Sequence, residues 1–190
     1  MRAETQHNFD LRITKKIINM NSNHLLETEY SGPFANYVRE AGQINLIEEL
    51  EISLHDFIRF VQNIPLDKFD YRYAEGKWTI KDIIQHLIDC ERIFGYRALR
   101  FSRNDKTALP GFEENDYVDN TYANGRSIQE LLTEFSAVRH STLLFYKSLS
   151  EEQLKRIGTA STHQISARAL GYVIIGHQKH HQNIFEERYL

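Results

Sequence analysis

Hydrophobic side chains recur at steps of three and four residues along most of the chain beyond residue 31. This is the spacing of one buried face of an α-helix. The recurrence divides into four stretches, which cover residues 47–61, 80–101, 131–149 and 170–184. Four long amphipathic helices bury their apolar faces against one another, so we expect an all-α fold, a four-helix bundle. No convincing pair of strands is evident within this region.

Polar residues at the expected helix starts support these boundaries. The pairs Thr79–Asp82 and Ser127–Glu130 have the spacing of a capping box, in which each residue satisfies a free backbone N–H group of the other. Ser166 marks the start of the last helix. The sequence therefore predicts where three of the four helices begin.

Two connections between the helices are long, residues 104–126 and 150–163. Loops of the length of the first are usually functional or disordered in compact domains. Both connections permit either alternating helix directions or a crossover, and the sequence leaves this open. We expect one domain over residues 31–190. It follows an N-terminal extension, residues 1–30, that is weakly structured or serves as a docking arm for a second subunit.

Composition excludes several classes of protein. The formal net charge of the 190-residue chain is −3, which argues against nucleic acid as the main partner. No run of apolar residues is long enough to span a membrane. The single cysteine, Cys90, rules out an internal disulfide framework and favours a reducing, cytoplasmic location.

Histidine supplies the candidate chemistry. His177 and His181 are four residues apart, so they lie on one face of the last helix, and this is its apolar face. Imidazoles in a bundle core need hydrogen-bond partners or a metal ion. His86 lies at the edge of the apolar face of the second helix and is the best third ligand. Three histidines leave a tetrahedral ion with one open position, as in catalytic zinc sites.

Other interpretations of these histidines stay open. The pair on the last helix could be core histidines with ordinary hydrogen bonds. Cys90, four residues after His86, could join the three histidines in a closed structural zinc site. His180 points about 100° away from His181 around the helix, so we expect it at the rim of the site. The remaining histidines are expected to be bystanders: His7, His24, His55, His140 and His163.

Several short motifs, taken in order, make the sequence similar to the DinB-like superfamily, which includes the YfiT-like proteins. The motifs are residues 76–82 (GKWTIKD), 86–89 (HLID) with Glu91 and 96–97 (YR), 109–112 (LPGF) with 117–118 (YV), Phe135 with Arg139 and Thr142, and 176–181 (GHQKHH) with 187–189 (ERY). The resemblance covers roughly residues 31–190. It implies a four-helix bundle that binds a divalent ion, zinc or nickel, through His86, His177 and His181.

The resemblance also implies an activity. Related members include bacillithiol transferases and mycothiol-dependent isomerases, and other members are described as metal-dependent hydrolases. We therefore expect a transferase that activates a low-molecular-weight thiol as co-substrate for attack on a small-molecule substrate. Hydrolysis by metal-bound water is one alternative, and a non-enzymatic, metal-stabilised interaction module is another. The resemblance further implies a homodimer.

Few other side chains are candidates for the reaction, and no general base is evident. Asp89 and Glu91 could orient a ligand imidazole, as carboxylates beside metal-bound histidines do. Arg97, eleven residues after His86, could meet a charged substrate group, but a salt bridge at the surface or the bundle end is the simpler expectation. Three aromatic residues could form the pocket wall: Trp78, Phe112 and Tyr117.

Overall fold

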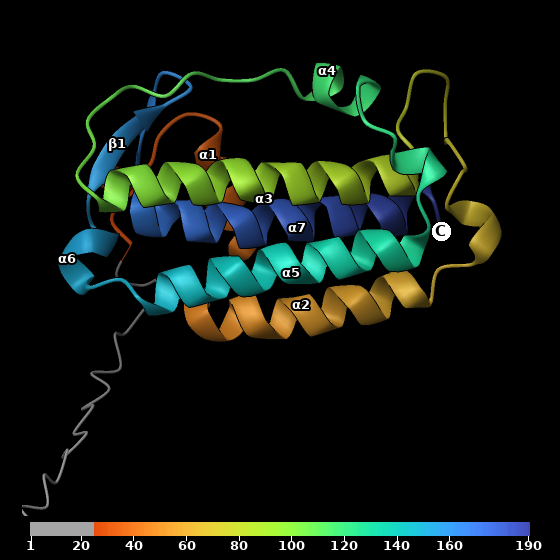
Figure 1. The fold of residues 1–190 in the computed structure, drawn as a ribbon, viewed down its shortest axis with the longest axis horizontal. Coiled ribbons are helices and arrows are strands. Elements are labelled where there is room, and N and C mark those ends of the chain that lie inside the picture. Colours follow the sequence, from red (N-terminus) through yellow and green to blue (C-terminus); the bar gives the residue numbers. More distant parts are fainter. Residues whose placement is uncertain (1–24) are drawn as a thin grey trace, which may run out of the picture.

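The computed structural model describes residues 25–190, and four long helices dominate it (Figure 1). The long helices are α2 (Leu46–Gln62), α3 (Ile80–Ser102), α5 (Ile128–Lys147) and α7 (Ala167–Arg188). Their apolar faces meet in the interior, so the predicted four-helix bundle is confirmed. Within the described residues, no helix is both long and apolar enough to cross a membrane.

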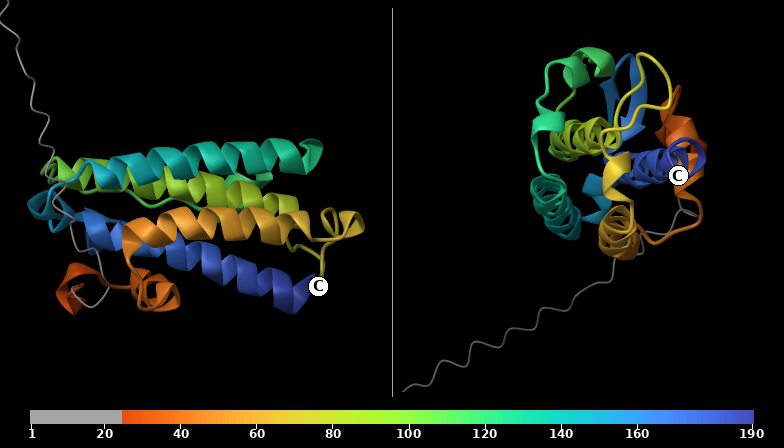
Figure 2. Two further views of the ribbon diagram at one scale, coloured as in Figure 1. Left: turned by 90° about the horizontal axis from the view of Figure 1, so that it is seen from below. Right: turned by 90° about the vertical axis from the view of Figure 1, so that its right-hand side faces the viewer.

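Seen end-on, α2 and α3 occupy opposite corners of the bundle, as do α5 and α7 (Figure 2). Side-chain contacts show which helices are neighbours. Phe57 of α2 packs on Phe135 of α5, with ring centroids 4.8 Å apart, and on Phe185 of α7, at 6.4 Å. Glu91 of α3 binds Arg139 of α5. Helix α3 therefore lies between α5 and α7, and its buried face meets both.

The helix directions settle the question that the sequence left open. The start of α3 lies near the start of α5, because Thr79 Oγ1 donates to the Asn124 side chain just before α5. The end of α7 lies there too, since the Tyr189 hydroxyl donates to the carbonyl of Trp78. Thus α3 and α5 run in the same direction, and the connection between them returns along the length of the bundle (Figure 1).

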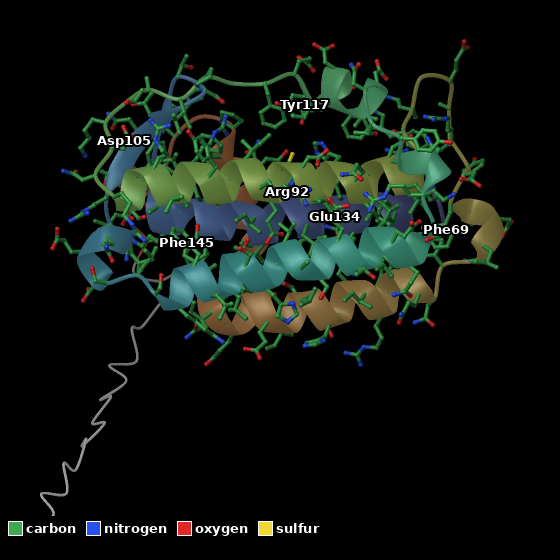
Figure 3. All side chains as sticks on the ribbon, viewed as in Figure 1. Phe69, Arg92, Asp105, Tyr117, Glu134 and Phe145 are labelled. Carbon is green, nitrogen blue, oxygen red and sulfur yellow. The ribbon has the colours of Figure 1, made fainter. Side chains whose placement is uncertain are left out.

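This connection carries a short helix, α4 (Glu114–Asp119), and a 3-10 turn, η4 (Ala123–Gly125). Figure 3 shows Tyr117 on this segment, above α3. Below it, Arg92 of α3 and Glu134 of α5 form an ion pair at 2.7 Å (Figure 3). The long connection is thus an ordered cover over one face of α3.

The predicted helix starts are those observed. The side chains of Thr79 and Ser127 each accept a hydrogen bond from the backbone three residues on, and Asp82 and Glu130 return the bond to form complete capping boxes. Ser166 caps α7 through the backbone N–H of Ala169. Local hydrogen bonding therefore fixes these helix starts, which is why the sequence predicts them well.

The sequence indicated no pair of strands, and this prediction was wrong. An antiparallel hairpin, β1 (Ile157–Ala160) and β2 (His163–Ser166), lies between a short helix, α6 (Glu151–Leu154), and α7. Its strands have four residues each, too few for a clear alternation. Its two-residue turn uses Ser161 and Thr162 at positive φ, +49° and +70°, where Asn-Gly or Gly would be the usual signal. The backbone of Leu109 in the long connection pairs with β1 as well.

A short helix, α1 (Phe34–Ala41), packs across α7 and was not predicted as a separate element. The 3-10 turns η2 (Glu27–Glu29) and η3 (Leu66–Lys68) complete the elements of the described residues. Glu29 is buried against Arg168 of α7, so the chain contacts the bundle before residue 31. Residues 1–24 lie outside the described residues, and the docking arm expected there stays a prediction.

Candidate metal centre

Three imidazole nitrogens converge between α3 and α7. His86 Nε2 lies 3.0 Å from His177 Nε2, which lies 3.1 Å from His181 Nε2. All three side chains are buried, with 3%, 3% and 8% exposure respectively. The structure thus brings together the three residues that the sequence singled out as metal ligands.

Their positions follow from the helix geometry. His177 and His181 are one turn apart on α7, and His86 lies in the second turn of α3, which packs antiparallel to α7. The glycine before His177 permits close packing behind the site. A Cβ atom on Gly176 would lie 1.7 Å from the carbonyl oxygen of Tyr37, so only glycine lets α1 approach α7 here.

The two short separations, from His177 to His86 and to His181, are each compatible with ligands of one metal ion. For bonds of 2.0–2.1 Å, ligand nitrogens are about 3.4 Å apart at tetrahedral angles and about 3.0 Å apart at right angles. The two observed separations need shifts of only a few tenths of an ångström to meet either geometry. A cation can accept a lone pair from each of the three nitrogens. Without a cation, two of these nitrogens satisfy each other only if one carries an N–H group and the other a lone pair.

Burial keeps these imidazoles neutral, which is the state that binds a metal. Desolvation lowers the pKa of His86 to about 4. Desolvation and the neighbouring histidines lower the pKa of His177 and of His181 well below the ordinary value. Among the residues that the structure describes, His181 Nδ1 is the single fully buried side-chain nitrogen or oxygen without a hydrogen-bond partner. The cluster therefore holds uncharged donors that are incompletely paired within the protein.

Cys90 is buried beside His86 and gives a second donor set. Its Sγ is 3.6 Å from Nδ1 and 3.7 Å from Nε2 of His86. One ligand atom each from His86, Cys90 and His177 lie within 4.8 Å of one another. Burial raises the pKa of the Cys90 thiol, and the charge of Glu114 raises it further, so the thiol is neutral without a metal. His86 and His177 are common to both donor sets.

Aromatic rings surround the histidines. Trp78 lies against His86, with ring centroids 4.8 Å apart. Tyr37 of α1 and Phe94 of α3 contact His177 edge-on, at 5.0 and 5.8 Å. These rings restrict the imidazole orientations and lower the local polarity. Trp78 also lines the pocket beside His181, as expected, whereas Phe112 and Tyr117 do not line it.

A carboxylate that the sequence analysis missed faces the cluster. Glu114 Oε2, at the start of α4, lies 3.9 Å from His86 Nε2, and its side chain is 55% exposed. Glu114 is one of several acidic residues in the long connection. Nothing in its spacing ties it to His86, because the contact depends on how that connection crosses α3. Its position identifies it as a candidate proton acceptor.

A pocket of about 240 Å³ reaches the cluster from outside. His181 lies at its inner wall, and Asn115, next to Glu114, lines it as well. Its remaining walls are largely aromatic or aliphatic: Tyr73, Gly76, Lys77, Trp78, Ile83, Ile184 and Tyr189. A small molecule can therefore approach His181 beside the segment that carries Glu114.

Neither carboxylate proposed to orient a histidine does so. Asp89 accepts a hydrogen bond from Gln85 and lies 3.6 Å from Arg92. Glu91 forms a buried bidentate pair with Arg139, which also donates to Gln178, the neighbour of His177. The orienting role is therefore wrong for both residues, because Asp89 interacts with side chains of α3 itself and Glu91 with α5.

The salt bridge expected for Arg97 is not present among the described residues. This residue is 3% exposed and forms no salt bridge with any described residue. It donates instead to the carbonyl of Pro110 and to Ser161 Oγ, because the long connection and the hairpin cover it.

The other described histidines are not part of the cluster of ring nitrogens. His180 is half-buried at its edge, with its ring centre 5.2 Å from that of His181 and 5.8 Å from that of Tyr37, and it lines a different pocket. His55 and His140 are exposed, and His163 packs against Phe34. His7 and His24 lie outside the described residues.

Comparison with known proteins identifies the family. The family model of the DinB superfamily matches residues 49–185, so the chain belongs to the DinB superfamily, as the motifs predicted. Among solved structures, YfiT from Bacillus subtilis is similar. YfiT is described as a probable metal-dependent hydrolase with an unusual four-helix bundle topology. The two structures have a TM-score of 0.65, and the match covers 84% of this chain and 91% of YfiT. The sequences are 16% identical, so the comparison shows a shared fold. No curated protein matches the chain.

Proposed function

We propose that the chain is a metal-dependent enzyme whose ion is held by His86, His177 and His181. The observation that carries this proposal is the meeting of three neutral ring nitrogens within 3.0–3.1 Å steps. A divalent ion there supplies a Lewis acid that lowers the pKa of a bound thiol or water. Zinc and nickel both suit imidazole ligands.

Residues around the histidine cluster would bind the substrate and accept a proton. The pocket beside His181 admits the substrate, and its aromatic walls exclude water from the apolar part of a ligand. Glu114 accepts the proton of the nucleophile, because its carboxylate is the nearest acidic group that the site presents toward solvent. Cys90 stays a buried neighbour of His86 in this assignment.

Two nucleophiles fit this arrangement. A low-molecular-weight thiol, which the family resemblance implies, would make the chain a bacillithiol-type S-transferase and is our leading proposal. Water would make it a hydrolase, and YfiT is described as a probable metal-dependent hydrolase. The expected small-molecule substrate and homodimer remain part of the proposal.

Turnover assays of metal-loaded protein separate the two reactions. The first assay follows thiol-dependent conjugation of an electrophile, and the second follows hydrolysis of simple esters and amides.

Glu114→Gln should lower turnover about 100-fold, the usual effect of losing a general base, without changing metal content. Asp116→Asn, two residues away on the same short helix and exposed, is the matched control and should keep full activity. Equal activity in the two variants would remove Glu114 from the reaction.

A chelator tests the non-enzymatic alternative. If the ion is catalytic, removing it abolishes turnover while the melting temperature falls only modestly, because the apolar core stays intact. Unfolding of the metal-free protein would instead mark a structural site.

A further inference from the structure

Arg97 is a buried cation whose charge is not balanced by any carboxylate within 4 Å among residues 25–190. Arg139, the other fully buried arginine of this region, is paired with a carboxylate. It binds Glu91 through two nitrogens and donates to Ser53 and Gln178 as well. Burying a cation without an opposite charge beside it is costly, even where uncharged groups accept some of its hydrogen bonds.

Most of the donors of Arg97 are unused. The hydrogen bonds to the carbonyl of Pro110, at 2.9 Å, and to Ser161 Oγ, at 3.1 Å, both come from Nη2. Both acceptors are uncharged. Nε and Nη1 carry three further N–H groups, which have no partner among the described residues. Neither atom is fully enclosed, since His181 Nδ1 alone in this part of the chain is both fully buried and unpartnered.

Arg97 lies along α3 on the side of the metal centre. The steps from His86 to Cys90, to Phe94 and to Arg97 are of four, four and three residues, so these side chains share one face of the helix. The guanidinium carbon is 6.0 Å from the ring of Phe94, and that ring is 5.8 Å from the ring of His177. One aromatic ring therefore separates the guanidinium from a candidate metal ligand.

The cover over Arg97 is built to hold the guanidinium plane in place. Phe112 of the long connection lies over it, with 5.9 Å between the guanidinium carbon and the ring centre. Ser161 occupies the strained turn of the hairpin, and Gly111 packs against its side chain. A planar cation beside two rings, with Nη2 bound and Nε and Nη1 free, can still bind an oxyanion through parallel N–H groups, as arginine commonly does.

We propose that Arg97 binds an oxyanion, a carboxylate or phosphate group, of the molecule that reacts at the histidine cluster. This inference rests on the proposed function for the identity of that molecule, but the anion site itself does not require a metal. It predicts that the substrate or the thiol co-substrate is an anion, and that Arg97 gives specificity without taking part in bond making.

Anion binding to the metal-free protein tests the site alone. Succinate and inorganic phosphate are titrated at matched ionic strength, with chloride as reference, by calorimetry and thermal unfolding. We expect one of the two to bind and raise the melting temperature of the wild type, and which of them binds distinguishes a carboxylate site from a phosphate site. Arg97→Met should abolish binding. Arg92→Met, on the same helix but exposed and paired with Glu134, should keep it.

A second titration connects the anion site to the metal centre. Cobalt-loaded protein is titrated with 6-mercaptohexanoate and with 6-mercaptohexanol, which differ only in the carboxylate, while the visible spectrum reports sulfur binding. The carboxylate thiol should bind about tenfold more tightly to the wild type, as expected for a charge-assisted hydrogen bond, and the difference should vanish in Arg97→Met. Arg97→Lys should restore part of it, because the charge remains without the fork geometry.

The outcomes separate this inference from the proposed function. Failure of cobalt to bind would contradict the metal centre while leaving the succinate and phosphate titration as a test of Arg97. Anions that bind neither better than chloride nor differently in Arg97→Met would overturn the inference, and Arg97 would then only tie the long connection to the hairpin.

Discussion

Glu91 and Arg139 show how single residues can support the site from within the core. Their side chains are 3% and 1% exposed and form a bidentate pair, and Arg139 also holds the amide of Gln178 beside His177. The pair joins α3, α5 and α7 at the depth of the histidines. The family motif includes both residues, but sequence alone could not show that they bind each other, because they are 48 positions apart.

Arg139→Met should destabilise the protein by about 3–5 kcal/mol, because it leaves the Glu91 carboxylate buried without a partner. The double variant Arg139→Met with Glu91→Gln should be more stable than the single variant, since no charge is then left unpaired. Urea unfolding measures both. Arg59→Met, which breaks the exposed pair with Asp56, is the control and should change stability by less than about 1 kcal/mol. Equal effects of Arg59→Met and Arg139→Met would contradict this account of the core.

The depressed pKa of His86 predicts how the metal-free protein responds to acid. In the unfolded chain His86 binds a proton near pH 6.5, but in the folded protein only near pH 4. Between these values the unfolded state holds more protons, so stability falls as pH falls through this window. His86 alone should account for a loss of about 2 kcal/mol between pH 7 and pH 5. Urea titrations of metal-free wild type and His86→Gln should differ in this slope, and identical slopes would show that His86 is solvated.

At the scale of elements, the range of each interaction along the sequence determines whether the element could be predicted. Helices α2, α3, α5 and α7 carry long apolar stripes, and caps such as Thr79 and Ser127 act within three residues, so local sequence specifies them. The hairpin and the contact of Glu114 with His86 depend on how the long connection crosses the bundle. Such contacts join residues distant in sequence, which periodicity cannot detect.

The contact of α1 with α7 leads to a test at this scale. Gly176→Ala should destabilise the protein by about 1–3 kcal/mol, because the added methyl group collides with the backbone at Tyr37 and pushes α1 away from His177. Gly95→Ala on α3 is the matched control. Its Cβ would meet nothing within 4 Å, so it should be neutral or stabilise the helix by up to about 1 kcal/mol. A fully stable Gly176→Ala protein would show that α1 packs less closely than described.

At the scale of the whole molecule, the long connection from α3 to α5 determines which side chains cover the histidine cluster and Arg97. Because α3 and α5 are parallel, the connection between them must return along the bundle, and in doing so it places Glu114 beside His86 and Phe112 over Arg97. The histidine triad could be inferred from spacing and family motifs. Its cover could not, since the sequence permits either helix order. The helices supply the candidate metal ligands, and the crossing segment supplies the groups that would face a substrate under the proposed function.

Metal analysis of protein purified without a histidine tag, and then loaded with zinc or nickel, tests the central claim most directly. The wild type should retain one ion per chain, His181→Ala should lose it, and His180→Ala should keep it. Cys90→Ser should also retain the ion, which distinguishes the three-histidine site from a site that includes the thiol. A wild type that holds no stoichiometric metal, or a His181→Ala protein that binds as tightly as the wild type, would contradict the account.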